Sequence, residues 1–391
     1  MKAEPDKNPA KNVVTSMINY KIILVGFYIF LFVFVFTILF IQINDPITWV
    51  LGDWLVNYSD GGFKRRGLSG NIFFVLQDLT GLQLTFLVFC IQVTLYGIFL
   101  IFFLKLIWDK LIGPYFLTLV LSPLTFLFMM NKPAAIGRKE IIIIVIFTFF
   151  VYLLSKKQLD RRKEISILIL LSFSCLLHEL IVFYIPFFLL ALYVHNNKKV
   201  DLKRWGIYLA SVGIPTFILW VFGGPINQGS SLEILNSRGV ALEGGIYSWT
   251  VVAYQYIWEN LSGYSLYFVC YLIGVIHFYF FASMRLNLGS NFLKLYGFAI
   301  LFSIPLFFLA IDWGRWLFIH FTLLVILLGS CLEYSKYWQD STIKPDRAAV
   351  ISLLIILPLN IWSVGIHSKG LNLDGGVFSV FSKIPELIIV F

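Results

Sequence analysis

Residues 165–195, ISILILLSFSCLLHELIVFYIPFFLLALYVH, decide how often the chain crosses a membrane. The stretch is apolar except for His178 and Glu179 near its middle, and lysine- and arginine-rich segments flank it on both sides. One membrane-spanning helix needs about 20 apolar residues, so this stretch is too long for one span. Because cytoplasmic loops are enriched in lysine and arginine, both flanks are expected on the same side. We therefore predict two short helices that cross and return, with His178 and Glu179 at the turn.

The whole composition is that of a membrane protein. Hydrophobic residues make up 59% of the chain, aromatic residues 18% and charged residues only 13%, which excludes an ordinary soluble domain. Apolar runs recur along all 391 residues without a long polar stretch between them, so we expect a single polytopic membrane domain over 1–391. The first run, 22–43, is too long for a signal-peptide core and is expected to stay as an anchor.

Further apolar runs of about 17–25 residues predict the other spans. Together with the two short helices above, they predict an all-α polytopic membrane protein with about eleven transmembrane helices. The expected ranges are 22–43, 82–107, 114–130, 141–155, 206–222, 263–282, 294–311, 316–333 and 348–366.

The distribution of cations predicts the orientation. With eleven spans, 20 of the 30 lysines and arginines lie in the N-terminal tail 1–21 and in the loops on the same side, and 10 lie on the other side. This bias predicts a cytoplasmic N-terminus and an outer C-terminus. The larger outer loops are then 44–81 and 223–262, and we expect 371–391 to be an interfacial segment on the outer face.

The outer cations are concentrated in short polar junctions. These are SDGGFKRRGLSG (59–70), NKPAAIGRKE (131–140) and AIDWGRW (310–316), and LLHEL (176–180) adds an acid and a histidine. Ionisable residues at the ends of membrane helices are costly and therefore indicate a functional site. We expect one outer cavity that contains Lys64, Arg65, Arg66, Arg138, Lys139, Glu140, His178, Glu179, Asp312 and Arg315.

Each junction also has a structural interpretation. The basic residues of 59–70 could anchor the chain to lipid phosphates, with the following segment lying flat as an amphipathic helix. Glu140 could begin an ordinary helix, since acidic side chains are favoured in a first turn. The His178 and Glu179 side chains could be a hydrogen-bonded pair, and Asp312 with Arg315 a local ion pair. Val182 stands where a zinc-binding HExxH motif needs its second histidine, so no metal site is expected.

Several outward arginines beside a base suit one kind of chemistry. Arginine binds phosphate oxygens with two parallel hydrogen bonds, and it stabilises negative charge when the phosphate is the leaving group. A carboxylate or histidine can deprotonate an incoming sugar hydroxyl. The set therefore predicts metal-independent glycosyl transfer from a lipid-linked phosphate or pyrophosphate, without a cofactor.

The ordered motifs SDGGFKRRGLSG, GRKE, HE and DWGRW in an eleven-span chain resemble bacterial O-antigen polymerases, in the wider company of GT-C glycosyltransferases. The resemblance implies polymerisation of undecaprenyl-pyrophosphate-linked repeat units at the periplasmic face of the bacterial inner membrane. It implies phosphate contacts from Arg65, Arg66, Arg138 and Arg315, which Lys64 and Lys139 would join. The base candidates are His178, Glu179 and Asp312, together with Glu140.

One departure keeps alternatives open. The long loop 223–262 holds a single arginine, Arg238, where such polymerases often show several. A transferase with a polyprenyl-phosphate-sugar donor is one alternative, and a non-enzymatic transporter or flippase of lipid-linked glycans is another. The expected partners are a polyprenyl-linked glycan and membrane lipid, with a chain-length regulator or a flippase as candidate protein partners and no nucleic acid.

Overall fold

The chain folds as a helical bundle. The computed structural model describes residues 9–332 except 60, 227–228, 244, 248–251 and 287, and beyond 332 it describes 350–351, 354, 356, 363–367 and 370–372. The helices of the first half are α1 (Pro9–Asn44), α2 (Thr48–Leu55), α3 (Gly67–Thr80), α4 (Leu84–Ile107), α5 (Pro114–Val120), α6 (Phe126–Asn131), the 3-10 helix η1 (Pro133–Ala135), α7 (Ile141–Ser155) and α8 (Arg161–Leu177).

The second half continues the bundle. Its helices are η2 (Glu179–Tyr184), α9 (Ile185–His195), α10 (Leu202–Phe222), α11 (Gly229–Ser237), η3 (Gly245–Tyr247), α12 (Ala253–Glu259), α13 (Leu261–Arg285), α14 (Gly289–Leu309) and α15 (Trp313–Ser330). The two-residue strands β1 (Ser363–Val364) and β2 (Leu371–Asn372) pair antiparallel.

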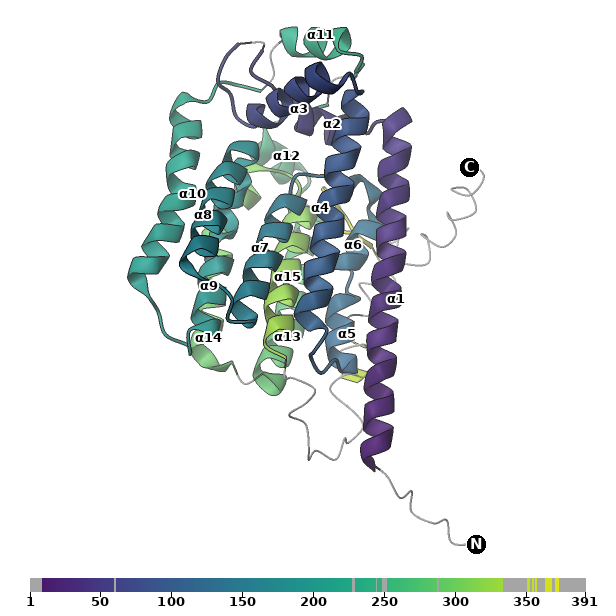
Figure 1. The fold of residues 1–391 in the computed structure, drawn as a ribbon, viewed down its shortest axis with the longest axis vertical. Coiled ribbons are helices and arrows are strands. Elements are labelled where there is room, and N and C mark those ends of the chain that lie inside the picture. Colours follow the sequence, from purple (N-terminus) through teal and green to yellow (C-terminus); the bar gives the residue numbers. More distant parts are fainter. Residues whose placement is uncertain are drawn as a thin grey trace, which may run out of the picture.

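Helix α15 lies at the centre of this bundle. It packs against α4, α7, α9 and α13, and the long helices run side by side around it (Figure 1). Its sequence is apolar on nearly every side, which is typical of a helix that is surrounded by others. Of this segment, 94% is buried inside the molecule. The first turn of α15, which includes the charged Arg315, therefore lies inside the molecule.

The outer helices expose apolar side chains, as a lipid-facing surface requires. Trp220, Phe222 and Phe217 of α10 are 79%, 69% and 59% exposed. Among the described residues, six helices are long and apolar enough to cross a membrane, namely α1, α4, α10, α13, α14 and α15, and α7 and the segment η2–α9 are shorter apolar helices. The chain is therefore a helical membrane protein, as predicted.

The predicted break within 165–195 is confirmed. Helix α8 ends at Leu177, His178 adopts an extended backbone, and η2 followed by α9 completes the stretch. The Asp160 side chain caps α8 by accepting a hydrogen bond from the Lys163 amide at 2.9 Å. Pro186 lies in the first turn of α9, a position where its missing N–H costs no helix hydrogen bond.

The single helix predicted over 114–130 is wrong. Helices α5 and α6 replace it, with the chain between them interrupted at Ser122 and Pro123. The Thr125 hydroxyl lies 2.9 Å from the carbonyl oxygens of Leu119 and Val120 and 3.0 Å from that of Ser122. The single hydroxyl hydrogen is shared among these carbonyl groups, which the break leaves without their usual helical partners, and so helps to hold the break inside the bundle.

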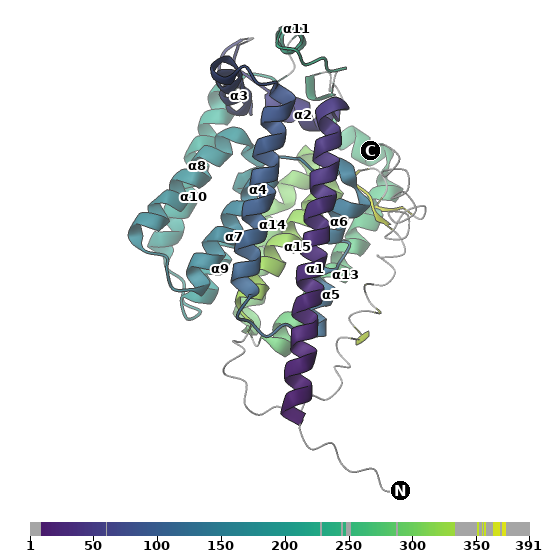
Figure 2. The ribbon, with the colours of Figure 1, turned by 45° about the vertical axis from the view of Figure 1, so that its right-hand side comes forward.

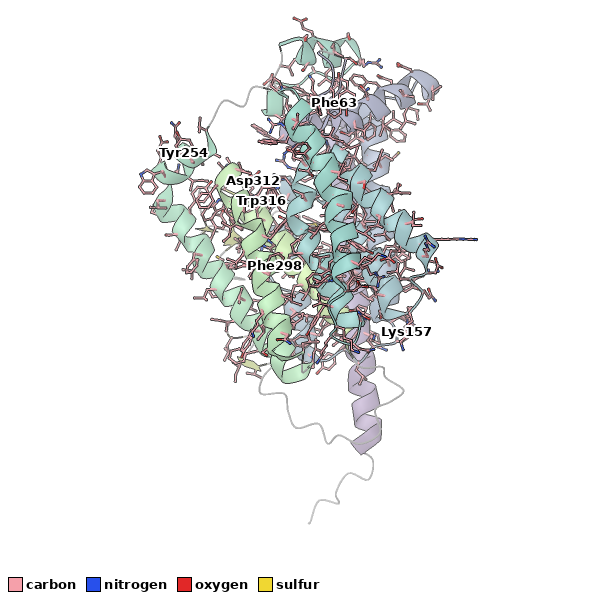
Figure 3. The ribbon with its side chains drawn as sticks, turned by 90° about the vertical axis from the view of Figure 1, so that its left-hand side faces the viewer. Phe63, Lys157, Tyr254, Phe298, Asp312 and Trp316 are labelled. Carbon is pink, nitrogen blue, oxygen red and sulfur yellow. The ribbon has the colours of Figure 1, made fainter. Side chains whose placement is uncertain are left out.

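The bundle has two distinct ends. At one end, Lys156 pairs with Asp109 at 2.7 Å and His195 lies 2.9 Å from the Ser330 hydroxyl. We call this the far end. Asp312 and Trp316 lie toward the opposite end, where Phe63 also lies, whereas Lys157 lies at the far end (Figure 3). Because α8 begins and α9 ends at the far end, residues 165–195 cross the bundle and return.

The predicted outer loops carry short helices. Helices α2 and α3 form most of 44–81, and α11, η3 and α12 lie within 223–262. Helices α2, α3 and α11 lie across one end of the bundle (Figure 2). The predicted span 348–366 lies mostly outside the described residues, and its last part contains β1 instead of helix. Within the predicted interfacial segment, residues 371–372 form β2 and 373–391 lie outside the described residues.

Candidate functional site

Charged side chains from five segments meet at the end opposite the far end. We call them the charged cluster: Asp53 of α2, Arg66 before α3, Arg138, Lys139 and Glu140 before α7, His178 and Glu179 at the α8–η2 break, and Asp312 and Arg315 at the start of α15. Four cations thus lie among four carboxylates and a histidine.

Arg66 joins two distant segments. Its Nε lies 3.0 Å from both carboxylate oxygens of Glu179, and its Nη2 donates to Oε1 at 2.9 Å. Its Nη1 donates to Asp53 Oδ1 at 3.1 Å. The Arg66 backbone has φ 62°, in the left-handed region that non-glycine residues rarely adopt. The turn before α3 is therefore held in an uncommon conformation that aims this guanidinium inward.

Asp53 and Lys139 form the most deeply buried pair. Lys139 Nζ lies 3.9 Å from Asp53 Oδ1 and donates to the Leu177 carbonyl at 3.1 Å. Burial lowers the pKa of Lys139 to about 8, against the opposing attraction of Asp53. Burial alone would raise the pKa of Asp53, but Lys139 and Arg66 outweigh it and hold that pKa well below its usual range.

Arg315 joins the rest of the cluster to α15. Its Nη2 forms an ion pair with Glu140 Oε1, and its Nη1 donates to Asp312 Oδ2 at 2.6 Å. His178 lies between the two halves of the cluster, with Nε2 3.6 Å from Glu140 Oε1 and Nδ1 3.9 Å from Glu179 Oε2. A continuous chain of ionisable groups therefore runs from Asp53 to Asp312.

Arg138 differs from the other arginines of the cluster. Its Nη1 donates to the Trp49 carbonyl at 3.1 Å and its Nε to the Ala134 carbonyl at 3.4 Å. Among the described residues, no carboxylate lies within ion-pair distance of its guanidinium. Arg66 and Arg315, in contrast, each bind two carboxylates. Arg138 is thus the half-buried arginine of the cluster best able to take an anionic ligand.

A cavity beside Arg138 and Arg315 is small. It is lined also by Glu140, Tyr96 and Phe318, and its volume is about 10 Å³. That is room for about one water molecule. This cavity is too small for a sugar phosphate, so the substrate-sized outer cavity stays a prediction.

Two of the ten predicted site residues lie apart from the cluster. Lys64 is buried, and its backbone pairs with Gly224 in an isolated parallel bridge. Arg65 is exposed, and its Cγ lies beside Gly223. The other eight predicted residues belong to the cluster.

Two further groups were not among the predicted residues. Asp53 lies in WVLGDWLV, where it resembles an isolated acid in an apolar helix. His367 Nδ1 lies 4.0 Å from Asp312 Oδ1, although 55 residues separate them in the sequence. An acid inside an apolar segment was the available signal for Asp53, whereas no local pattern marks His367.

Comparison with known proteins gives no relative. No protein-family model, no curated protein and no solved structure matches this chain.

Proposed function

We propose that this chain is a glycosyltransferase of bacterial surface-polysaccharide biosynthesis, which polymerises undecaprenyl-pyrophosphate-linked O-antigen repeat units at the periplasmic face of the inner membrane. The observation that carries the proposal is the charged cluster, which is built from distant segments at one end of an apolar bundle. Ionisable groups in such a place are costly and are usually retained for function.

The orientation follows from the two ends. The cation-rich segments 156–163 and 198–204 lie at the far end, beside the ion pair of Lys156 and Asp109. The positive-inside rule makes that end cytoplasmic and the charged cluster periplasmic. The proposed topology has about eleven spans, with a cytoplasmic N-terminus and a periplasmic C-terminus. The cluster then lies at the depth of a lipid-linked head group.

The arginines of the charged cluster have different partners, and we therefore assign them different roles. Arg66 and Arg315 hold carboxylates in place, whereas Arg138 is the first contact for a pyrophosphate oxygen. A positioned cation beside the leaving group stabilises the negative charge that develops as the glycosidic C–O bond breaks. Lys139 adds positive charge behind Arg138 and supports the same step.

Asp312 is the most accessible carboxylate of the charged cluster. Its side chain is 25% exposed, compared with 18% for Glu179, 8% for Glu140 and 2% for Asp53. Burial raises the pKa of Asp312, against the attraction of Arg138. The acceptor hydroxyl is therefore deprotonated on the Asp312 side of the cluster.

An apolar cavity that opens at the surface of the bundle suits a lipid-linked substrate. It has a volume of about 270 Å³ and is lined by α13, α14 and α15, including Phe278, Tyr296 and Leu324. Leu324 follows Arg315 by nine residues, about 14 Å along a helix. An isoprenoid chain whose head group binds the cluster would extend in this direction.

The proposal is tested with Arg138→Ala in the native bacterium. We expect the surface-glycan ladder to collapse to a lipid core that carries one repeat unit, at unchanged protein level. Arg238→Ala is the matched control, because Arg238 lies outside the cluster and pairs with Asp78 at 2.8 Å. The ladder of the control should persist.

Other outcomes identify the alternatives. A ladder that persists with one sugar missing would indicate a single-sugar transferase with a polyprenyl-phosphate donor. A lipid core without any repeat unit would indicate a transporter or flippase. An unchanged ladder in Arg138→Ala would contradict a role for the cluster in glycan synthesis.

A further inference from the structure

A hairpin near the C-terminal end of the described chain is fastened to the start of α15. The Gly314 amide donates to the Ile366 carbonyl at 3.1 Å, and the Gly370 amide donates to the Gly263 carbonyl of α13 at 2.9 Å. A Cβ on Gly314 would collide with the Gly365 carbonyl oxygen. Only glycine allows this close approach, so the DWGRW motif contains a docking position for the hairpin.

The docking places a histidine beside the charged cluster. His367, which lies between β1 and β2 in the sequence, has its Nδ1 4.0 Å from Asp312 Oδ1. The other oxygen of Asp312 accepts a hydrogen bond from Arg315 Nη1 at 2.6 Å. The carboxylate is therefore held on one side, while the imidazole is 49% exposed and accessible to an acceptor.

We propose that His367 is the general base of the transfer reaction and that Asp312 positions it. This inference rests on the proposed glycosyltransferase function and identifies a catalytic residue for it. Hydrogen bonds of catalytic groups are often long before substrate binds. A rotation of the exposed imidazole would bring its Nδ1–H to Asp312, which leaves Nε2 unprotonated and directed outward.

The chemical step balances with these groups. His367 Nε2 accepts the proton of the acceptor hydroxyl, and the acceptor oxygen forms the new bond to the anomeric carbon of the donor sugar. The bond between that carbon and the phosphate oxygen breaks, and its electron pair leaves with the pyrophosphate. Arg138 faces the leaving group, and the imidazolium formed on His367 is stabilised by Asp312.

The surroundings of His367 predict a pH dependence. Among the described residues, Asp312 faces the imidazole, and Arg315, Arg138 and Arg66 are the cations around Asp312. Transfer requires the neutral imidazole, so acidification, which protonates an imidazole, should lower the rate. In His367→Gln, which lacks the imidazole, this decrease of the rate at low pH should disappear.

The test uses the full chain in lipid nanodiscs with an undecaprenyl-pyrophosphate-linked repeat unit as donor and acceptor. His367→Gln should lower kcat about 100-fold or more, with donor binding unchanged. Added imidazole should restore turnover to His367→Ala. His195→Gln is the matched control at the far end, where His195 lies 2.9 Å from the Ser330 hydroxyl, and it should retain full activity.

The outcomes separate this inference from the proposed function. Suppose that the wild-type protein transfers sugar, and that His367→Gln transfers at the wild-type rate with the same decrease at low pH. Then His367 is not the base, while the glycosyltransferase function stands. If His367→Gln also loses donor binding, or imidazole gives no rescue, a structural role of the hairpin replaces the catalytic one. If the wild-type protein neither binds nor transfers the donor, the proposed function and the base assignment both fail.

Discussion

The two ends of the bundle bury cations in different ways. At the far end, Lys110 Nζ donates to the Ser330 carbonyl in the last turn of α15 at 3.1 Å, an arrangement that the negative end of a helix dipole stabilises. In the charged cluster, Arg66 instead binds carboxylates from α2 and from the α8–η2 break. The buried cation at the far end thus lies against the carbonyl end of a helix, whereas the cluster brings charges of both signs together from five segments at an energetic cost. That cost is the reason to assign function to the cluster.

The largest effect is expected from Arg66→Ala. The change leaves Asp53 and Glu179 buried without their shared guanidinium, and loss of one partner of a buried ion pair costs about 3–5 kcal/mol. Thermal unfolding in detergent should show a large drop in Tm. Arg66→Lys keeps the charge but cannot bind Glu179 through two parallel hydrogen bonds. Its Tm should therefore lie between those of Arg66→Ala and wild type.

Gly314→Ala should have the next largest effect. The new methyl group would collide with the Gly365 carbonyl, and overpacking of this kind costs about 1–3 kcal/mol. Gly297→Ala in α14 is the matched control, because a Cβ there meets no atom within 4 Å. It should leave Tm unchanged or raise it. Equal Tm values for the two variants would show that the hairpin does not dock on α15.

The decrease of the transfer rate at high pH should report the loss of the Lys139 charge. Its pKa is lowered to about 8, so the ammonium is present below that pH and is lost as the pH rises above it. If the charge supports donor binding, the rate should fall about tenfold for each pH unit above 8. In Lys139→Arg the decrease of the rate should begin at a higher pH, because arginine stays charged. A wild-type rate that stays constant from pH 7 to 10 would exclude this role.

The smallest effect is expected from Asp78→Ala. Asp78 and Arg238 form an ion pair on the surface, where Asp78 is 62% exposed, and such exposed pairs contribute little to stability. Neither Tm nor transfer should change measurably. A clear loss of transfer would extend the functional surface beyond the charged cluster.

The sequence was most informative where a local pattern determines structure. Long apolar runs predicted α1, α4, α10, α13, α14 and α15, and the His178–Glu179 dipeptide marked the break between α8 and η2. It failed at 114–130, where Pro123 accompanies a break. Pro215 and Pro305 lie inside α10 and α14 without ending these helices, so a proline alone does not predict where a helix breaks. The hydrogen bonds of the Thr125 hydroxyl, which close the break, depend on the folded chain.

The candidate site was predictable only in part for the same reason. Charged junctions identified most of the cluster, because ionisable residues are unusual near apolar spans. Asp53 was missed because its local sequence is that of an apolar helix, and its partners Arg66 and Lys139 come from elsewhere. His367 was missed because only the docking of the hairpin on Gly314 brings it to Asp312. Contacts between segments far apart in the sequence leave no local pattern.

The most direct test of the central claim is the affinity of the purified chain in nanodiscs for undecaprenyl pyrophosphate. The account predicts that Arg138→Ala weakens binding about tenfold or more, as loss of a charge-assisted hydrogen bond would, and that Arg238→Ala binds like wild type. Equal affinities for Arg138→Ala and wild type, with both proteins folded, would contradict the assignment of the charged cluster as the binding site of a lipid-linked pyrophosphate.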